Sequence, residues 1–343
     1  MNMQRTKYFL GIDISADTFS ASTISDPENV VFFVDDILNS FEGFELLNQQ
    51  LIQNKIATKE ITICLEATGV YAEKLCYYFA SKSYQVILAD PHKVNRATRD
   101  TPRKNDHIDA LRIAQYAYRY IDKLRLWQPR DEIIEQIKVL ISTREHISGH
   151  MVGDQNALKA LNRKHYQTPL ANKIYNETIL KLKEHIKEID KEIKCLIDKD
   201  DSFRHYVNLA KSVPGVGLLL AVNLLVLTNG RTEKLNYKKI AAYSGICPYE
   251  QKSGSSLNKK PRSKGCGPGK LRKLLYLASL SVRAHNLEFK KYFLRKSQEG
   301  KPNRIILNNI ANKILKITCA VINSENAFIN NYKSINPMLF KSA

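Results

Sequence analysis

The chain has little acidic charge, one tryptophan and no long apolar run. Asp and Glu number 34 against 53 Lys and Arg in 343 residues. No uninterrupted apolar run reaches about 18 residues, so we expect no membrane-spanning helix. The six cysteines include no Cys-x-x-Cys pair, which disfavours a zinc site and a disulfide framework. No signal-peptide pattern precedes the first strand pattern, so we expect a cytoplasmic protein with reduced thiols.

What the chain does have is a strong excess of positive charge. Its formal net charge is +19 at pH 7. Such an excess favours a polyanionic partner, because each neutralised phosphate releases counterions. No basic amphipathic anchor for a membrane surface stands out, so we expect nucleic acid as the partner and no membrane. A merely soluble basic protein is the alternative, and the size of the excess makes it the weaker one.

Residues 7–125 carry strand and helix patterns in a recognisable order. Apolar runs predict five strands, over 8–12, 19–25, 30–35, 61–66 and 84–89. One helix is predicted from a Ser40 cap to about residue 53, and another over 71–81. Three strands followed by alternating helices and strands is the order of an RNase H-like fold, an α/β mixed sheet flanked by helices.

Four carboxylates fall where such a fold can bind metal ions. Asp13 closes the first apolar run, and Glu66 closes the fourth. Asp106 and Asp109 are three residues apart, which places them on one face of a predicted helix. Because open sheets form their sites at the carboxyl ends of strands, we expect these side chains to converge. Carboxylates suit Mg²⁺, and a pair of such ions can hold both the attacking and the leaving oxygen of a phosphodiester.

Each carboxylate also has an ordinary structural explanation. Residues 11–13, Gly-Ile-Asp, resemble the first phosphate loop of actin-like ATPases, although the second glycine-rich phosphate loop is missing. Thr68 can cap the helix that follows Glu66, and Asp106 and Asp109 can favour a helix start through the helix dipole. Taken jointly these explanations are weaker, because four independent caps need not fall at the metal-binding positions of one fold.

The middle of the chain is predicted to be helical. Residues 131–161 predict one helix, and a second helix carries a heptad seam over about three heptads. The seam consists of Ile179, Leu182, Ile186, Ile189, Ile193 and Leu196. This pattern indicates an antiparallel helical hairpin or a dimerising coiled coil. Packing of the seam against the chain's own domains explains it nearly as well.

A second globular unit is predicted from about residue 207. Residues 213–217, Val-Pro-Gly-Val-Gly, resemble a helix-hairpin-helix turn. Its glycines permit a tight bend, and N–H groups at the following helix start can bind a phosphate. Residues 251–264 are predicted to form a polar, basic surface loop, and a helix with basic residues on one face begins at Lys270. A serine in this loop can attack a phosphodiester only if it is activated from elsewhere, because nothing local supplies a base.

In order and spacing these motifs resemble the DEDD-type transposases of insertion-sequence family 110, including the bridge-RNA-guided members. The matching segments are Gly-Ile-Asp at 11–13, Leu-Glu-Ala-Thr-Gly at 65–69, Lys-Asn-Asp-x-x-Asp-Ala at 104–110, Val-Pro-Gly-Val-Gly at 213–217, and Gly-Ile-x-Pro at 245–248 followed by Ser253-Gly254. The resemblance implies four parts. They are a RuvC-like (RNase H-like) catalytic domain at 1–127, a coiled-coil connector at 128–205, a mainly α-helical transposase domain at 206–322 and a tail at 323–343.

The resemblance also implies roles for individual residues. The residues implied to hold two Mg²⁺ ions are Asp13, Glu66, Asp106 and Asp109. The nucleophile implied is Ser253, with Ser255 and Ser256 as alternatives, and it would form a phosphoserine link to DNA. The implied partners are DNA, a guide RNA and further copies of the chain in a dimer or tetramer, in the bacterial nucleoid. The residues expected to contact nucleic acid are Arg103, Lys104, Gly215, Gly217, Lys252, Lys259, Lys260, Lys270 and Arg272.

We therefore expect a transposase that excises and inserts its own insertion sequence. A RuvC-like junction-resolving nuclease that uses metal-activated water is one alternative, and it would need neither the serine loop nor the long second domain. A catalytically inactive nucleic-acid-binding protein is the other, and the four intact carboxylates disfavour it.

Overall fold

The computed structural model describes residues 6–67, 69–97, 106–166, 168–230, 234–253, 257–262, 267 and 269–330. Within these ranges, the side chains of residues 106, 249–253 and 257–262 lie outside the description. The chain divides into two compact units, Met1–Pro129 and Arg130–Ala343. We refer to them as unit 1 and unit 2 and describe each by itself. The finer division predicted at residues 127 and 205 remains a prediction.

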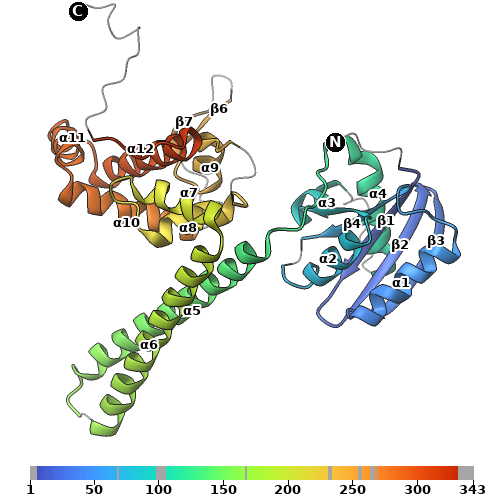
Figure 1. The fold of residues 1–343 in the computed structure, drawn as a ribbon, viewed down its shortest axis with the longest axis horizontal. Helices are drawn as coiled ribbons and strands as arrows, with labels where there is room; N and C mark the ends of the chain where they lie inside the picture. Colours follow the sequence, from blue (N-terminus) through green and yellow to red (C-terminus); the bar gives the residue numbers. More distant parts are fainter. Residues whose placement is uncertain are drawn as a thin grey trace, which may run out of the picture. The chain divides into compact units, whose positions relative to one another are not determined.

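Unit 1 is built on one mixed sheet of five strands (Figure 1). The strands are β1 (Tyr8–Ile14), β2 (Thr18–Asp26), β3 (Asn29–Leu38), β4 (Ile61–Glu66) and β5 (Gln85–Ala89). Their order across the sheet is β3-β2-β1-β4-β5. The first three strands pair antiparallel, whereas β4 runs parallel to both β1 and β5. All five predicted strands are present, and the mixed α/β architecture is consistent with an RNase H-like domain.

Helices cover both faces of this sheet. The core on one face joins α1 (Phe41–Gln53) and α2 (Glu73–Ser81) to the sheet. The core on the other face joins the sheet to α3 (Pro91–Ala97) and α4 (Asp106–Tyr120). Ser40 caps α1 as predicted, since its hydroxyl oxygen accepts a hydrogen bond from the Gly43 N–H at 3.4 Å. The helix α3 was not predicted, and it begins where the Asp90 carboxylate accepts a hydrogen bond from the His92 N–H at 2.9 Å.

Unit 2 begins with two long antiparallel helices, α5 (Glu132–Leu161) and α6 (Pro169–Lys199), which Figure 1 shows side by side. The Arg144 guanidinium donates two hydrogen bonds to the Asp190 carboxylate, at 2.6 and 3.1 Å, and so joins the two helices. Of the predicted heptad seam, Ile193 and Leu196 enter the core of unit 2 together with Ile137. The two long helices therefore pair with each other as an antiparallel hairpin, and the seam also packs on the core of its own unit.

The rest of unit 2 is mainly helical. Its helices are α7 (Asp201–Lys211), α8 (Leu218–Leu227), α9 (Tyr237–Tyr243), α10 (Gly269–His285), α11 (Leu287–Gln298) and α12 (Asn303–Ser324). Among the described residues, α12 is the one helix long and apolar enough to cross a membrane by length and composition. However, 56% of its apolar window is buried, in the core that also contains α8 and α10. Burial within the unit accounts for its apolar composition.

The basic segment near residue 250 differs from the prediction. Instead of a loop, the described backbone forms a two-stranded antiparallel hairpin of β6 (Tyr249–Ser253) and β7 (Leu257–Arg262). Ser253 pairs with Leu257 at the end of the ladder. The prediction was wrong because these strands lack the apolar alternation that indicates a half-buried strand.

Candidate active site and nucleic-acid interface

Asp13 and Glu66 lie side by side on one face of the sheet. Strands β1 and β4 pair in parallel up to Ile12 and Leu65, and the two carboxylates are the next residue on each strand. Ile12 and Leu65 are buried in the core beneath α1 and α2. Because successive side chains of a strand point to opposite faces, Asp13 and Glu66 lie on the face covered by α4. The sequence prediction that strand ends bring these two residues together agrees with this register.

The helix α4 packs very closely on this face because the residues between helix and sheet are small. A Cβ atom placed on Gly11 would lie 2.2 Å from the Ala110 carbonyl oxygen and 2.3 Å from the Ala114 nitrogen. Both alanines are fully buried. Gly11 precedes Asp13 by two residues on the same face, and Ala110 follows Asp109 directly. The close approach at Gly11 therefore brings the N-terminal turn of α4 toward the two strand-end carboxylates.

The three described carboxylates influence one another electrostatically. Burial, together with the negative charges of Asp13 and Asp109, raises the pKa of the Glu66 carboxyl above its ordinary value. The Asp109 carboxylate also accepts a hydrogen bond from the Arg112 guanidinium at 2.9 Å. This ion pair spans one helical turn and is about four-fifths buried on each side, at 19% and 23% side-chain exposure. One cation thus offsets part of the clustered negative charge and holds Asp109 in place.

The donor set fits a hard divalent cation by its chemistry. Asp13, Glu66 and Asp109 offer only carboxylate oxygens, the ligands that Mg²⁺ prefers. A cation between them would also reverse the repulsion that raises the pKa of Glu66. Within the described residues, no three metal-binding side chains are grouped closely enough to hold an ion as they stand. The predicted fourth ligand, Asp106, is the first residue of α4, and its side chain lies outside the description.

Two polar residues beside Asp13 were not predicted. Ser20 lies directly opposite Asp13 on β2, and its buried hydroxyl donates a hydrogen bond to the Asp35 carboxylate on β3. Asp35 thus lies near the carboxylate face as an additional acidic group. No local sequence signal marks this pair, because the contact depends on the antiparallel register and on the irregular pairing of β2 with β3 between Phe19 and Ala21.

Residues 213–217 form a tight turn between α7 and α8, and their likeness to a helix-hairpin-helix turn remains a prediction. The Val216 N–H donates to the Val213 carbonyl oxygen at 3.0 Å, with Pro214 and Gly215 as the two central residues. Gly215 has φ of +81°, as the third position of a type II turn requires. Gly217 caps α8 through its backbone and supplies no capping side chain. Gly217 therefore leaves the first N–H groups of α8 without a side-chain cap. A helix start in this state can donate its N–H groups to a bound anion.

A surface depression of about 480 Å³ lies at this turn. Gly215 and Gly217 line it together with Arg144 and Lys194 from the long helices. Arg144 is paired with Asp190, which also lines the depression. Backbone donors and two cations thus surround one concave surface within unit 2.

The other predicted nucleic-acid contacts are only partly described. Lys270 pairs with Glu145 at 2.7 Å, and the Arg272 guanidinium donates to the Ser244 carbonyl oxygen at 3.3 Å. Both side chains therefore already have partners within unit 2. The remaining predictions lie outside the described residues or their side chains: Arg103, Lys104, Lys252, Ser253, Ser255, Ser256, Lys259 and Lys260.

The mixed sheet and its acidic face are consistent with the RNase H-like DEDD domains of enzymes that cut and join DNA, and comparison with known families makes the class definite. Residues 10–166 match a family model described as transposase, of the DEDD type of IS110 elements. Residues 207–294 match a second model, described as transposase of the IS116/IS110/IS902 family. The protein is a DNA transposase or recombinase. It belongs to the IS110 family.

Curated relatives agree with this assignment. The pilin gene-inverting protein of Moraxella bovis is 27% identical over 329 residues, which cover 94% of this chain and 98% of that protein. Its counterpart in Moraxella lacunata is 26% identical over the same length. An uncharacterized 44.8 kDa protein of the insertion element IS116, from Streptomyces clavuligerus, is 23% identical over 150 residues, or 44% of this chain and 36% of that protein.

Proposed function

We propose that the chain excises and inserts its insertion sequence through a covalent phosphoserine intermediate. The observation that carries this proposal is the placement of Asp13, Glu66 and Asp109 near one another, where burial and the charges of the two aspartates raise the pKa of Glu66. A structural role would gain nothing from such repulsion. A site for a cation that is bound together with a phosphate would require it.

In this proposal the carboxylates, with Asp106 as the fourth, hold two Mg²⁺ ions. Bound Mg²⁺ supplies charge neutralisation at the scissile phosphate. Arg112 keeps one Asp109 oxygen oriented while the other remains available. The tight contact of Gly11 with α4 keeps Asp109 near the strand ends, as a preorganised site demands.

Ser253 is the proposed nucleophile, and the chemistry balances without a further reactant. Its Oγ forms a bond to phosphorus, the bond from phosphorus to the leaving DNA oxygen breaks, and the serine proton ends on that oxygen. A hydroxyl of the other DNA strand then attacks the phosphoserine and releases Ser253. Ser255 and Ser256 are the alternatives for the same role. Because the hairpin carries lysines but no carboxylate ligand set, activation of the serine would have to come from groups outside the hairpin.

Nucleic acid would be held mainly by unit 2 and by basic segments. We assign phosphate contacts to the N–H groups at Gly215 and Gly217, because these glycines open onto a depression that Arg144 and Lys194 also line. Lys252, Lys259 and Lys260 would contribute from the hairpin, Lys270 and Arg272 from α10, and Arg103 and Lys104 from the segment before α4. DNA, a guide RNA and one or more further copies of the chain complete the proposed assembly, in the nucleoid of the bacterial cytoplasm.

Site-specific inversion of a DNA segment is a second candidate function. Two relatives named pilin gene-inverting proteins align with this chain over 98% of their own length. Inversion and transposition use the same cleavage and joining steps and differ in which ends are exchanged. A plasmid assay that carries the element's own ends in direct and in inverted orientation separates the two outcomes.

The phosphoserine intermediate can be tested directly. The full-length chain, incubated with Mg²⁺ and end-labelled DNA, should give a protein–DNA adduct that survives denaturant and maps to the peptide containing residues 251–256. Ser253→Ala should remove the adduct and leave DNA binding within about twofold. An adduct that persists in this variant moves the role to Ser255 or Ser256. Cleavage without any adduct in the wild type supports the junction-resolving nuclease instead.

A further inference from the structure

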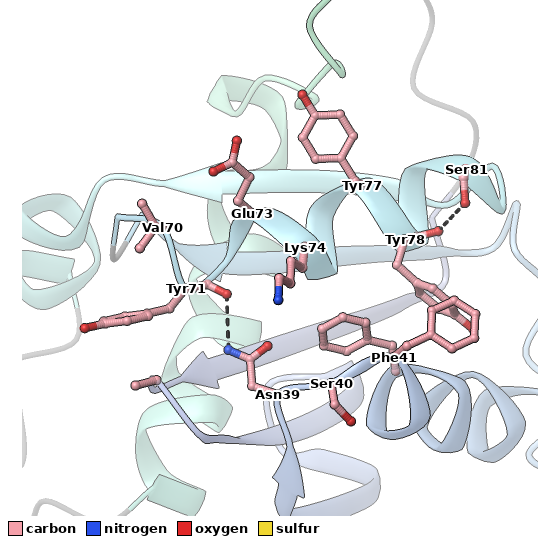
Figure 2. Close-up of a pocket in the computed structure, with 12 residues that line it drawn as sticks. Asn39, Ser40, Phe41, Val70, Tyr71, Glu73, Lys74, Tyr77, Tyr78 and Ser81 are labelled. Carbon is pink, nitrogen blue, oxygen red and sulfur yellow. Dashed lines mark hydrogen bonds between the residues drawn. The ribbon is translucent and has the colours of Figure 1, made fainter. Parts of the chain in front are cut away.

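Unit 1 has an aromatic groove that the reaction above does not use. Figure 2 shows it between the start of α1 and the face of α2, with a volume of about 1020 Å³. Its lining residues are Ala16, Asn39, Ser40, Phe41, Phe44, Val70, Tyr71, Glu73, Lys74, Tyr77, Tyr78 and Ser81. We refer to this surface as the α1–α2 groove. It lies on the face of the sheet opposite to α4.

The rim of the groove presents aromatic rings to solvent. Phe41 is 67% exposed and Tyr71 is 47% exposed, so both side chains are accessible at the rim of the same groove. Phe41 is nevertheless held in place, because its ring packs edge-on against Tyr78 at 5.4 Å between centroids. Tyr78 in turn packs against buried Phe44. The Phe41 side of the groove is therefore an aromatic surface that is held in place by the chain itself.

The polar groups of the groove are arranged for a ligand that carries both charge and hydrogen-bond donors. In Figure 2 the Lys74 side chain points into the groove, whereas the Glu73 carboxylate on the preceding residue points away from it. Among the described residues, Lys74 forms no ion pair within 4.0 Å. The Asn39 side-chain oxygen is buried and accepts no hydrogen bond from any of them. A free cation and an unused acceptor thus lie between two exposed rings.

The groove lies at the same end of the sheet as the proposed reaction centre, on the opposite face. Ala16 follows Asp13 by three residues, and Tyr71 follows Glu66 by five. The Asn39 amide connects the two strand ends, since it donates to the Ser15 carbonyl oxygen at 3.0 Å and to the Tyr71 carbonyl oxygen at 3.2 Å. A strand of nucleic acid that leaves the carboxylates across this edge of the sheet would meet the groove next.

We propose that the α1–α2 groove binds an unpaired nucleotide of the nucleic-acid substrate. A base stacks on the rings of Phe41 and Tyr71, its exocyclic amine or ring N–H donates to Asn39 Oδ1, and its phosphate contacts the Lys74 ammonium. With one lysine and one glutamate in its lining, the groove has no net formal charge, so stacking supplies most of the affinity. This inference rests on the proposed function, because the groove serves strands that the reaction has opened.

The single tryptophan provides a way to observe this binding. Trp127 packs edge-on against Tyr77, a lining residue, at 4.9 Å between ring centroids. Titration of the full-length chain with a short oligothymidine, an oligouridine of equal length and a blunt DNA duplex should change Trp127 fluorescence for the single strands and not for the duplex. The first two arms distinguish DNA from RNA as the source of the unpaired nucleotide.

Substitutions at the rim should weaken single-strand binding selectively. Phe41→Ala and Tyr71→Ala should each reduce oligothymidine affinity by about fivefold to a hundredfold, the range of one base–aromatic stack. The reduction factor should be the same at low and high salt, unlike the loss of a phosphate contact. Tyr71→Phe should keep wild-type affinity because it keeps the ring. Tyr166→Ala is the matched control, since Tyr166 is 87% exposed and lies in unit 2.

Three results would overturn the inference. Equal oligothymidine affinity of Tyr71→Ala and wild type would do so, as would a loss of the same size in Tyr166→Ala. A drop in the oligomeric mass of Phe41→Ala with single-strand binding intact would show a protein interface instead. Cleavage by Asp13→Asn is measured alongside. If Asp13→Asn is inactive and the groove variants bind normally, this inference alone fails; if Asp13→Asn cleaves normally, the proposed function fails.

Discussion

At the scale of single residues, the proposed metal-binding carboxylates of unit 1 lie close enough for their negative charges to repel one another. Asp13→Asn or Asp109→Asn should lower cleavage by about three orders of magnitude, because several kcal/mol of charge stabilisation at the phosphate are lost. For Asp13→Asn the Tm should stay within about 4 °C of wild type or rise, since clustered negative charge is relieved. Asp109→Asn should instead lower the Tm, because it leaves the Arg112 guanidinium without its partner. Calorimetry and a gel cleavage assay on the same preparations check both parts. Normal cleavage by either variant would remove that residue from the metal site.

The raised pKa of Glu66 gives a separate prediction about pH. Burial and the charges of Asp13 and Asp109 make the ionised carboxyl less favourable in the folded chain than in the unfolded chain. The stability associated with neutral Glu66 is therefore present at low pH and is lost as pH rises through the raised pKa. Glu66→Gln lacks this titration, so its Tm should exceed that of wild type at neutral pH, and the difference should shrink toward about pH 4.

Magnesium supplies the control for this pH effect. Mg²⁺ added at neutral pH should raise the Tm of wild type more than that of Glu66→Gln, because the ion compensates charges that the variant has reduced. Differential scanning fluorimetry in Mg²⁺ and in chelator measures the comparison. Identical Mg²⁺ responses of the two proteins would count against Glu66 as a ligand.

The sequence predicted that Asp13 and Glu66 lie near the ends of two strands, because each ends an apolar run, and β1 and β4 have this arrangement. It could not reveal Ser20 and Asp35 beside them, because that contact depends on the pairing of β2 with β3. Nor could it show that Lys270 and Arg272 already have partners in unit 2. A positive charge in the sequence identifies a candidate phosphate contact. Whether that side chain can bind a phosphate depends on neighbours that are distant in the chain.

At the scale of elements, the packing of α4 on β1 positions Asp109. Gly11→Ala should push α4 outward, because the added Cβ would meet backbone atoms at 2.2 and 2.3 Å. We expect a destabilisation of about 1–3 kcal/mol, typical of overpacking, and a loss of cleavage larger than the loss of DNA binding. Urea unfolding and the cleavage assay measure the two effects.

Gly149→Ala is the matched control for this prediction. Gly149 lies within α5, and a Cβ atom there has nothing within 4 Å. The substitution should stabilise the chain by up to about 1 kcal/mol through helix propensity and leave cleavage unchanged. If Gly11→Ala behaves like Gly149→Ala, α4 does not need its close approach to the sheet.

A helix or strand could be predicted where its own residues carry a clear hydrophobic pattern. The strand β4 was predicted with its observed bounds, since a continuous apolar run ends at a polar turn. The hairpin of β6 and β7 was missed because its charged residues match no strand pattern. The helix α3 was missed although it begins at Pro91, and proline is favoured at the first position of a helix.

At the scale of the whole molecule, the net charge of +19 should dominate nucleic-acid affinity. If about six phosphates are contacted, affinity should fall by about three orders of magnitude between 50 and 200 mM salt. Fluorescence anisotropy with labelled duplex DNA at several salt concentrations gives the slope. A flat response would mean that the positive charge is only a solvated surface.

The long helices of unit 2 differ in burial along their length. In α5 the buried residues are Ile134, Ile137 and Ile141, all in its first third, and the open glycines Gly149 and Gly153 lie beyond them. Among the described residues of unit 2, the outer part of the pair buries less than the part near the core, which gives a lower free energy of local opening. Backbone amides near residue 160 should exchange with deuterium well before those near residue 137. A partner that binds this end would slow amide exchange there first. The change in exchange rate along the two helices would therefore locate the binding site of that partner.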